Sequence, residues 1–303
     1  MSSLERVMFR YKRIIPKFDD FLRCMKTPLP RTVRINTLKA DSEEILQSLS
    51  EHGVIFKTFN WYEYGLRLLN VSSPGNLIEY FLGYIHTQEE VSMIPPIVLE
   101  PKPGELILDM CAAPGSKATQ ISQIMCNTGH VIANDVDLRR ISMLKSNYER
   151  LGVLNMSITV YDGRKFPNIS FDKILVDAPC SCEGIYRKNP SVFDNWSLKV
   201  IKNLSRLQKR LLSRAIQIAK RGGTVVYSTC TFSPEENEAV IDYVLSIYEG
   251  MIKLEEIKLD LEYCSGIKEW NGIKFNDEIS LCARFYPHLN DTGGLFVAKI
   301  RKI

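Results

Sequence analysis

The stretch "ELILDMCAAPGSKATQISQIMCNTGHVIANDVD", residues 105–137, decides the fold. Its apolar start predicts a short buried strand, residues 116–125 predict a helix, and residues 130–137 predict a second strand. The alternation continues, with helices predicted at 138–152 and 197–220 and strands at 156–162, 171–179 and 222–230. Strands that alternate with helices indicate a mainly parallel sheet with helices on both faces, so we predict an α/β fold.

A chain of 303 residues is long enough for two domains. The segment 79–105 contains two consecutive prolines and "PKPG", and the regular alternation begins directly after it. We therefore expect a smaller α+β domain over residues 1–85 and the α/β domain over residues 86–303. Residues 291–300, "DTGGLFVAKI", are expected to form a last strand, antiparallel and at or near an edge.

The charge distribution points to a polyanionic partner. Residues 1–40 hold ten Lys or Arg against three acids, and residues 187–221 hold ten against Asp194 alone. Separated basic blocks suit a long polyanion better than a small anionic metabolite, although solvated helix faces would give the same pattern.

Three classes of protein are disfavoured or excluded by simple features. No apolar run approaches the ~18 residues of a membrane helix, and the first residues carry no apolar stretch typical of a secretory signal. Eight cysteines without such a signal suggest free thiols in a reducing compartment. We expect a cytoplasmic protein without disulfides.

Several predicted strands end in an aspartate, namely Asp109, Asp135, Asp162 and Asp177. Ligands of doubly wound sheets bind beyond the carboxyl ends of the strands, so these acids are expected on one binding edge. The loop after the first strand, "DMCAAPGSK" (109–117), is neither a GxGxxG fingerprint nor a P-loop. Its small residues and single Lys117 suit a phosphate-poor nucleoside better than NAD, whose pyrophosphate needs more room and more amides.

Cys230 lies in "YSTCTFSPEENE" (227–238), where a buried strand is predicted to pass into a helix. Ser233, Pro234 and Glu236 have the pattern of an N-cap, a first-turn proline and a capping-box glutamate. A lone buried cysteine is more often structural than reactive. A helix start just after it would lower the pKa of its thiol and favour reactivity.

The motifs "DMCAAPGSK", "ILVDAPCSCEG" (174–184) and "YSTCTFSPEENE", in this order, resemble the Sun-domain (Fmu-type) RNA cytosine-5 methyltransferases. "PRTVRINTLK" (30–39), "YIHTQEEVSMIPP" (84–96) and "RFYPHLNDTGGLFVAKI" (284–300) resemble the flanking motifs of that family, so the resemblance covers nearly the whole chain. The compact length and the first of these segments look most like the archaeal tRNA-modifying members.

The resemblance implies a Rossmann-like methyltransferase sheet over residues 86–303, an RNA-binding domain over residues 1–85, and S-adenosylmethionine as cofactor. It implies that Cys230 attacks the base, that Cys180 assists release of the product, and that Asp177 lies between cofactor and base. The cofactor-binding residues that it implies are Cys111, Ala112, Ala113, Pro114, Gly115, Ser116, Lys117, Asp135, Arg140, Asp162 and Asp177.

Two residues depart from the family pattern, which commonly has glycine at both positions. Ser116 makes a positive φ there unfavourable. Cys182 adds a third thiol near the site. A metal site built from Cys180, Cys182 and Cys230 is disfavoured by the Cys-x-Cys spacing and the lack of a nearby histidine, so we expect no metal.

Contacts to RNA are the least defined feature. The predicted helix 197–220 has a basic face and an opposite apolar face that we expect to be core. Arg31, Arg34 and Lys39 are the candidates in the first domain, and Trp61, Tyr62 and Tyr64 could stack on bases or pack in the core. The basic face comprises Lys199, Lys202, Arg206, Lys209 and Arg214, and the apolar face Leu198, Ile201, Leu204 and Leu211.

The sequence favours RNA cytosine-5 methylation, with tRNA as substrate and a monomeric enzyme; rRNA is the first alternative. A DNA cytosine-5 methyltransferase would use the Pro179-Cys180 pair and make Cys180 the nucleophile, but the Ser-Thr-Cys motif at 228–230 argues against this. A protein of another class, one that binds RNA and cofactor without turnover, is disfavoured by the intact set of Asp177, Cys180 and Cys230.

Overall fold

The computed structural model describes residues 3–303, which divide by internal packing into two compact units. One unit is residues 30–175, and the other combines the residues up to 29 with residues 176–303. This division follows packing within the chain. The functional division expected from the sequence, residues 1–85 and 86–303, stays a prediction.

The unit of residues 30–175 begins with a small antiparallel sheet. Its strand order is β2-β3-β1-β4, and its side chains Val33, Ile35, Leu66 and Ile85 lie in one buried cluster with Ile45 and Leu49 of α3. The small α+β fold expected for this region is confirmed for residues 31–87. The elements are β1 (Arg31–Ile35), α3 (Ser42–Glu51), β2 (Phe56–Thr58), β3 (Gly65–Leu68), α4 (Ile78–Phe81) and β4 (Ile85–Thr87).

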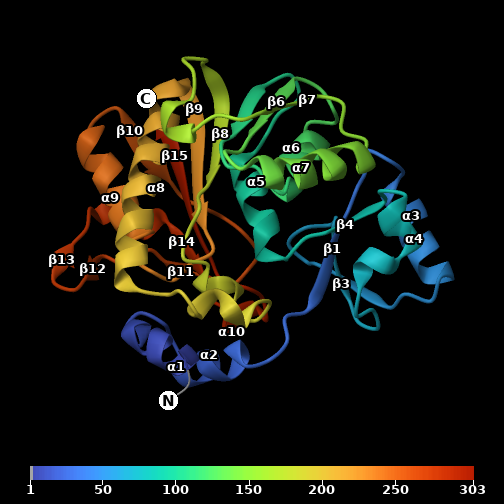
Figure 1. Ribbon diagram of the computed structural model, residues 1–303, viewed down its shortest axis with the longest axis horizontal. Coiled ribbons are helices and arrows are strands. Elements are labelled where there is room, and N and C mark those ends of the chain that lie inside the picture. The colour runs from blue at the N-terminus through green and yellow to red at the C-terminus, as the bar shows by residue number, and fades with distance from the viewer. Residues whose placement is uncertain (1–2) are drawn as a thin grey trace. The chain divides into compact units, whose positions relative to one another are not determined.

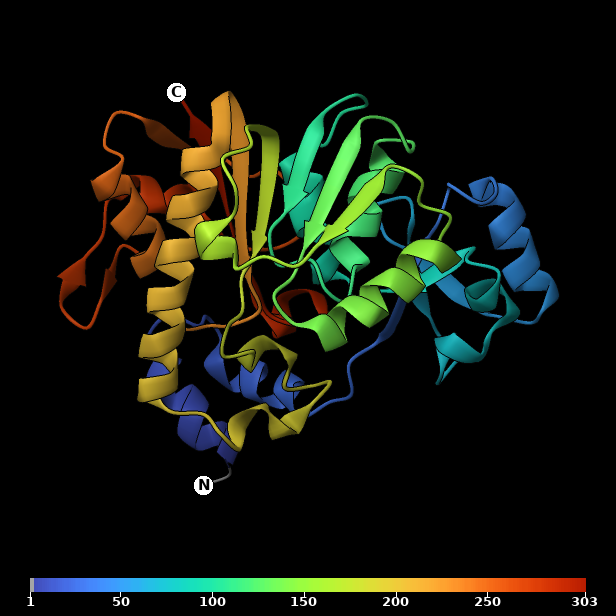
Figure 2. The same ribbon diagram turned by 45° about the horizontal axis from the view of Figure 1, so that its top comes forward.

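The same unit continues into the predicted parallel sheet. Strand β5 pairs in parallel with β6 and β8, and β6 pairs in parallel with β7. Figure 2 shows β5, β6 and β7 fanned side by side, and helix α6 packs between α5 and α7 (Figure 1). The elements are α5 (Ile94–Leu99), β5 (Leu106–Asp109), α6 (Ser116–Ile124), β6 (His130–Asn134), α7 (Leu138–Arg150), β7 (Met156–Thr159) and β8 (Phe171–Asp177).

The other unit is built on antiparallel strands. Strand β15 pairs antiparallel with β9, β10 and β14, so the last strand is antiparallel as expected but lies inside the strand order, between β14 and β9. The main elements after β8 are α8 (Leu198–Ile218), β9 (Ala219–Thr229), α9 (Glu238–Ile247), β10 (Ile252–Glu255), β11 (Cys264–Ser265), β14 (Ala283–Phe285), α10 (Pro287–Asn290) and β15 (Leu295–Lys302). A hairpin of β12 (Glu269–Trp270) and β13 (Ile273–Lys274) stands apart from this sheet.

The first residues of the chain belong to this second unit. Helices α1 (Ser3–Met8) and α2 (Phe18–Met25) bury apolar side chains in a cluster that includes Phe193, Phe232 and Tyr286. The ring of Phe21 meets the ring of Phe232 edge to face, with centroids 5.4 Å apart. The segment that follows Cys230 therefore packs against the amino-terminal helices through Phe232.

Two sequence predictions in this unit are wrong. Helix α9 begins at Glu238 and not at Ser233, because residues 234–237 form hydrogen-bonded turns in which Glu236 N donates to Ser233 O. In α8, Ile201 and Leu211 are buried as expected, but Leu198 is 51% exposed because it lies in the first turn of the helix.

Among the described residues, no helix is long and apolar enough to cross a membrane.

Candidate active site

The loop between β5 and α6, residues 111–115, is fixed by the end of β6. Ala112 N donates to Asn134 O over 2.7 Å, and Ala113 N donates to Asp135 Oδ2 over 3.2 Å. Arg140 from α7 donates to Ala113 O and lies 3.3 Å from Asp135 Oδ2. The structure thus brings four of the predicted cofactor residues into one cluster beyond the parallel strands.

Gly115 is the residue that lets this loop turn into α6. Its φ of 104° lies in the region that favours glycine, and a Cβ there would stand 2.6 Å from Leu144 Cδ1 of α7. Ser116 follows inside the helix, so the expected absence of a positive φ at Ser116 is confirmed. Lys117 Nζ donates to Ser92 Oγ over 3.2 Å.

Asn134 joins the ends of the parallel strands, a role that the sequence analysis missed. Its Nδ2 donates to Met110 O and Tyr161 O, both over 3.0 Å, and its Oδ1 accepts from Tyr161 N. Asp109 ends β5 and is buried. Because one amide holds the residues after β5 and β7, the loops that carry the strand-end acids are aligned at one edge.

Asp162, like Asp135, is paired with an arginine. Arg164 Nε donates to both carboxylate oxygens, over 2.8 and 3.0 Å, and Arg164 Nη2 donates over 2.6 Å. These hydrogen bonds hold the pKa of Asp162 below its usual value. The carboxylate therefore stays ionised, as an acceptor for hydroxyl or amino groups must be.

A buried histidine links the small sheet to the start of α6. His86 of β4 contacts Ser116 Oγ through Nε2 over 2.8 Å and Arg150 Nη2 through Nδ1 over 2.9 Å. Because the guanidinium can only donate, Nδ1 accepts and Nε2 carries the proton. Burial first, and then the charges of Arg34 and Arg150, lower the pKa of His86 well below its usual value, so the ring is neutral.

The second unit brings two predicted catalytic thiols together. Cys180 follows β8 and Cys230 follows β9, and their Sγ atoms lie 3.3 Å apart. Cys182 Sγ lies 4.0 Å from Cys180 Sγ. The pairing that holds these turns together includes Ala178 N donating to Ser228 O and Gly184 N donating to Cys230 O.

The ionisation of the thiols is governed by their contact. The hydrogen bond from Cys180 lowers the pKa of Cys230, but the contact with Cys182, burial and the charge of Asp177 raise it, and the net pKa is well above its usual value. The contacts with Cys182 and Cys230 and burial raise the pKa of Cys180 as well. The expected lowering by a helix start is wrong, because α9 begins eight residues after Cys230.

Glu236 contacts Ser181, the residue between Cys180 and Cys182. It is fully buried and accepts from Ser181 N over 3.0 Å, Ser181 Oγ over 2.5 Å and Gln208 Nε2 over 2.9 Å. Burial raises the pKa of Glu236 to about 7, although these donors lower it. The residue read from the sequence as a capping glutamate is instead a brace for the turn that carries Cys180 and Cys182.

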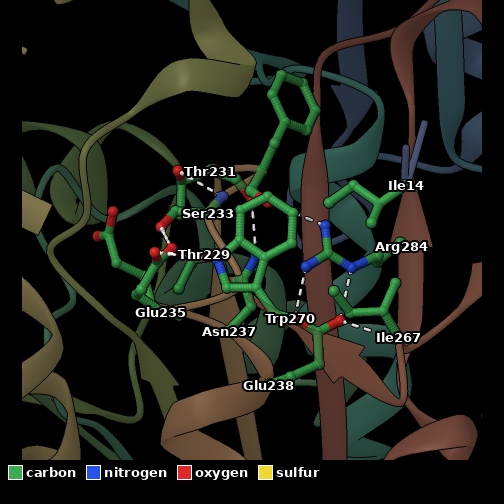
Figure 3. Close-up of polar contacts among 12 residues, drawn as sticks. Ile14, Thr229, Thr231, Ser233, Glu235, Asn237, Glu238, Ile267, Trp270 and Arg284 are labelled. Carbon is green, nitrogen blue, oxygen red and sulfur yellow. Dashed lines mark hydrogen bonds and ion pairs between the residues drawn. The ribbon is translucent and has the colours of Figure 1, made fainter. Parts of the chain in front are cut away.

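Asn237 clamps the residues on both sides of Cys230 (Figure 3). Thr229 Oγ1 donates to Asn237 Oδ1 over 2.6 Å, and Asn237 Nδ2 donates to Thr231 O over 2.9 Å. Arg284 of β14 donates to Phe232 O over 3.0 Å and pairs with Glu238 at the start of α9. No sequence signal marked Asn237 or Arg284: Asn237 contacts residues six and eight positions away across a turn, and Arg284 contacts residues 46 and 52 positions away.

Asp177, the last residue of β8, accepts from Ser228 Oγ over 2.8 Å. This contact ties the carboxylate to the residue two positions before Cys230. The structure therefore brings together Asp177, Cys180 and Cys230, the residues that the family resemblance implied for catalysis, and their catalytic roles stay a prediction.

The candidate RNA-binding residues separate into exposed and buried groups. Arg31 and Lys39 are exposed, as are Lys199, Lys202 and Arg206 of α8. Arg34 is fully buried, and its guanidinium hydrogen bonds to Gln88, Gln123 and Thr119, so its assignment to RNA is wrong. Trp61, Tyr62 and Tyr64 are half-buried, and Trp61 stacks on Phe59 with ring centroids 5.9 Å apart.

Two family models match the chain, one over its first part and one over the rest. Residues 96–301 match the model described as 16S rRNA methyltransferase RsmB/F. Residues 10–73 match the ferredoxin-like domain of the RsmF/B-like methyltransferases.

Individual proteins are similar over the full length. The tRNA (cytosine(49)-C(5))-methyltransferase of Pyrococcus abyssi is 43% identical, covering 98% of this chain and 96% of that protein. A crystal structure of a methyltransferase homolog protein from Pyrococcus horikoshii is 36% identical, with a TM-score of 0.87 over 99% of this chain and 95% of that one. The structure of NSun6 from the same organism with SFG is 26% identical, with a TM-score of 0.83 over 100% and 98% of the two chains. Several rRNA cytosine methyltransferases are also similar, but the chain spans only 36% to 60% of their lengths.

Proposed function

The chain belongs to the RsmB/F methyltransferase family, and from this membership and its site we propose that it is an S-adenosylmethionine-dependent RNA cytosine-C5 methyltransferase acting on tRNA. The observation that carries the proposal is the 3.3 Å separation of the Cys180 and Cys230 thiols at the ends of two strands, beside Asp177. One thiol can add to a pyrimidine, and a second thiol and a carboxylate beside it can assist the addition and its reversal.

We assign nucleophilic attack to Cys230. Its Sγ, having lost its proton, adds to carbon 6 of the cytosine, and carbon 5 becomes an enamine carbon. Supporting this assignment, Cys230 Sγ lies 3.3 Å from Cys180 Sγ, close enough for the Cys180 thiol to donate to a Cys230 thiolate. S-adenosylmethionine supplies the electrophilic methyl group that carbon 5 accepts.

Asp177 and Cys180 complete the cycle. Asp177 hydrogen bonds to the ring nitrogen or amino group of the cytosine and stabilises the adduct. After methylation the proton on carbon 5 passes to solvent, its bonding electrons restore the double bond between carbons 5 and 6, and Cys230 Sγ leaves carbon 6 as a thiolate. Cys180, within hydrogen-bond distance of Cys230 Sγ, assists this release.

The residues at the edge of the parallel strands fit an adenosyl cofactor. Asp135 and Asp162 offer carboxylates for ribose hydroxyls and for the adenine side. The turn of Cys111, Ala112, Ala113, Pro114 and Gly115 carries little side chain, and Ser116 and Lys117 begin a nine-residue helix whose start suits a carboxylate. Arg140 holds Asp135 and Ala113 O in place.

The substrate assignment rests on coverage. The relative that the chain spans almost completely is a tRNA enzyme, whereas the rRNA enzymes are much longer than this chain. We further propose residues 1–85 as the RNA-binding part and residues 86–303 as the catalytic part, in a monomeric cytoplasmic protein. An rRNA substrate is the second candidate, favoured by the family description.

Single-turnover assays on three proteins test the nucleophile. Wild type, Cys230→Ala and Cys180→Ala are incubated with unmodified tRNA and methyl-labelled cofactor, then separated on denaturing gels. We expect Cys230→Ala to lose product by at least about 10⁴-fold, since removal of a nucleophile abolishes covalent catalysis. We expect Cys180→Ala to accumulate a protein–RNA adduct.

The matched control is Cys126→Ala, which removes an exposed thiol of the other unit. An adduct in Cys230→Ala and none in Cys180→Ala would transfer the attack to Cys180. Methylation of rRNA fragments but of no tRNA by the wild type would overturn the substrate proposal alone.

A further inference from the structure

A third thiol completes a cluster beside the proposed catalytic pair. The Sγ atoms of Cys180, Cys182 and Cys230 all lie within 4.8 Å of one another, with separations of 3.3 Å from Cys180 to Cys230 and 4.0 Å from Cys180 to Cys182. Proposed catalysis uses only two of these thiols. Cys182 is therefore a nucleophilic group without a role in that reaction.

The backbone at Cys182 is unusual for a residue with a side chain. Its φ of 59° and ψ of 24° lie in the left-handed region, which favours glycine and is unfavourable for cysteine. This conformation places the thiol against Cys180, with Cys182 Sγ 3.3 Å from Cys180 O. The turn therefore carries a thiol at position 182, where its left-handed backbone would favour glycine.

Both thiol-bearing turns are rigidly joined. Ser181 N and Oγ are held by Glu236, and Ser181 Oγ lies 2.7 Å from Thr231 Oγ1. Gly184 N donates to Cys230 O over 2.8 Å, a close approach that only glycine allows, because a Cβ on Gly184 would stand 2.9 Å from Cys230 O. The three sulfur atoms are thus preorganised by contacts that do not involve the thiols.

We propose that Cys180, Cys182 and Cys230 form a binding site for a thiophilic divalent cation of the Zn²⁺ class. Zinc–sulfur bonds of about 2.3 Å imply sulfur–sulfur separations of about 3.8 Å in a tetrahedral site, and the separations of 3.3 and 4.0 Å bracket this value. Soft thiolate donors select such cations over Mg²⁺ or Ca²⁺. Three protein ligands leave a fourth position for water.

The Cys-x-Cys spacing argued against a metal in the sequence because it is shorter than the Cys-x₂₋₄-Cys spacing usual for zinc and no histidine lies nearby, yet the three Sγ atoms lie within 4.8 Å of one another. Cys230, fifty residues from Cys180, supplies the third ligand. Each thiol that binds the cation gives up its proton, so binding releases up to three protons and no electron is transferred. The cation is not a cofactor of methylation: it occupies the Cys230 sulfur.

Metal occupancy consequently inhibits methyl transfer, and a chelator reverses the inhibition. This consequence rests on the proposed role of Cys230, whereas binding of the cation does not. The two are separated by measuring binding and activity independently.

The binding test uses Cd²⁺, whose thiolate bonds absorb in the ultraviolet, and Zn²⁺, counted by elemental analysis after gel filtration. The proteins are wild type, Cys182→Gly, Cys182→Ser and Cys126→Gly, all kept reduced with a phosphine. Cys126→Gly is the matched control, because Cys126 is an exposed cysteine that also has a left-handed φ, 51°. We expect wild type and Cys126→Gly to bind one cation and both Cys182 variants to lose more than the ~10–100-fold in affinity that loss of an outer-shell partner costs.

Methyl transfer is measured on the same samples. We expect Zn²⁺ to slow wild type and Cys126→Gly, and to leave the rate of Cys182→Gly equal to that variant's own rate without cation. Equal cation affinity in wild type and Cys182→Gly would overturn the proposal. It would also be overturned if wild type bound a cation that Cys126→Gly does not bind, and bound no other. If the cation binds as expected but leaves methylation unchanged, the site stands and the role of Cys230 fails.

Discussion

Two buried arginines, one in each packing unit, have contrasting electrostatic surroundings. Arg284, beside the Cys230 turn, pairs with Glu238, and the two side chains are 2% and 0% exposed. Arg34, which joins β1 to α6, is equally buried but hydrogen bonds to the neutral side chains of Gln88, Gln123 and Thr119.

Their ionisation differs accordingly. Burial lowers the pKa of Arg34 to about 10. Burial also lowers the pKa of Arg284, but the charge of Glu238 more than offsets this and the net pKa is raised. The Arg284 guanidinium is thus paired with a buried carboxylate, whereas the Arg34 guanidinium only donates to neutral groups. Removal of the two side chains should therefore change the stability of the protein by unequal amounts.

The largest effect is expected when the ion pair is broken. Arg284→Met leaves Glu238 buried without its cation and should destabilise the second unit by about 3–5 kcal/mol. Hydrogen exchange of the β9 and β14 amides measures this loss. The double variant Glu238→Leu with Arg284→Met removes both charges and should recover most of the stability; a double variant as unstable as the single one would show that packing, and not charge, dominates.

Glu236, a buried acid that hydrogen bonds to neutral groups, extends the comparison to the dependence of stability on pH. The pKa of Glu236 rises from 4.5 in the unfolded chain to about 7 in the fold. Between these values the unfolded chain has lost the proton and the folded protein has kept it, so stability falls as pH rises, by about 3 kcal/mol in total, and levels off above pH 7.

The measurement is the free energy of unfolding of wild type and Glu236→Gln across this range. Glutamine keeps the shape of the side chain but does not titrate, so the difference between the two proteins isolates Glu236. Parallel pH profiles would mean that Glu236 does not carry the dependence.

Arg34→Met should cost less than Arg284→Met. It leaves amide and hydroxyl groups without a donor, at about 1–3 kcal/mol, but it leaves no buried charge behind. Hydrogen exchange of the β1 and β4 amides measures the effect, with Arg31→Met as the exposed control on the same strand. A loss equal to that of Arg284→Met would contradict the distinction drawn from the partners.

The smallest effect is expected at Ser116. Ser116→Ala removes the hydroxyl that contacts His86 Nε2 and should cost about 1 kcal/mol, with cofactor affinity, measured by calorimetry, reduced less than about tenfold. A much larger loss of affinity would mean that Ser116 contacts the cofactor directly.

Local sequence determined the elements of the parallel sheet. The apolar runs at 106–109 and 171–177 and the small turn at 111–115 lead to β5, β8 and the loop before α6 in the expected places. Strand periodicity and glycine backbone freedom are local properties, so a single sequence carries them. The resemblance of three motifs to a known family also implied Asp177, Cys180 and Cys230 as one catalytic set.

Tertiary structure alone decided what surrounds those residues. Arg34 has the composition of an RNA-binding residue but is buried, since Gln123 and Thr119, more than eighty positions away, take its hydrogen bonds. Glu236 has the spacing of a helix cap but braces Ser181, and Asn237 clamps both neighbours of Cys230. Cys182 lies two positions from Cys180 in the chain, but it gains Cys230 as a second thiol neighbour only through the fold. Hydrogen-bond partners and burial depend on contacts between distant segments, and no local pattern of residues encodes them.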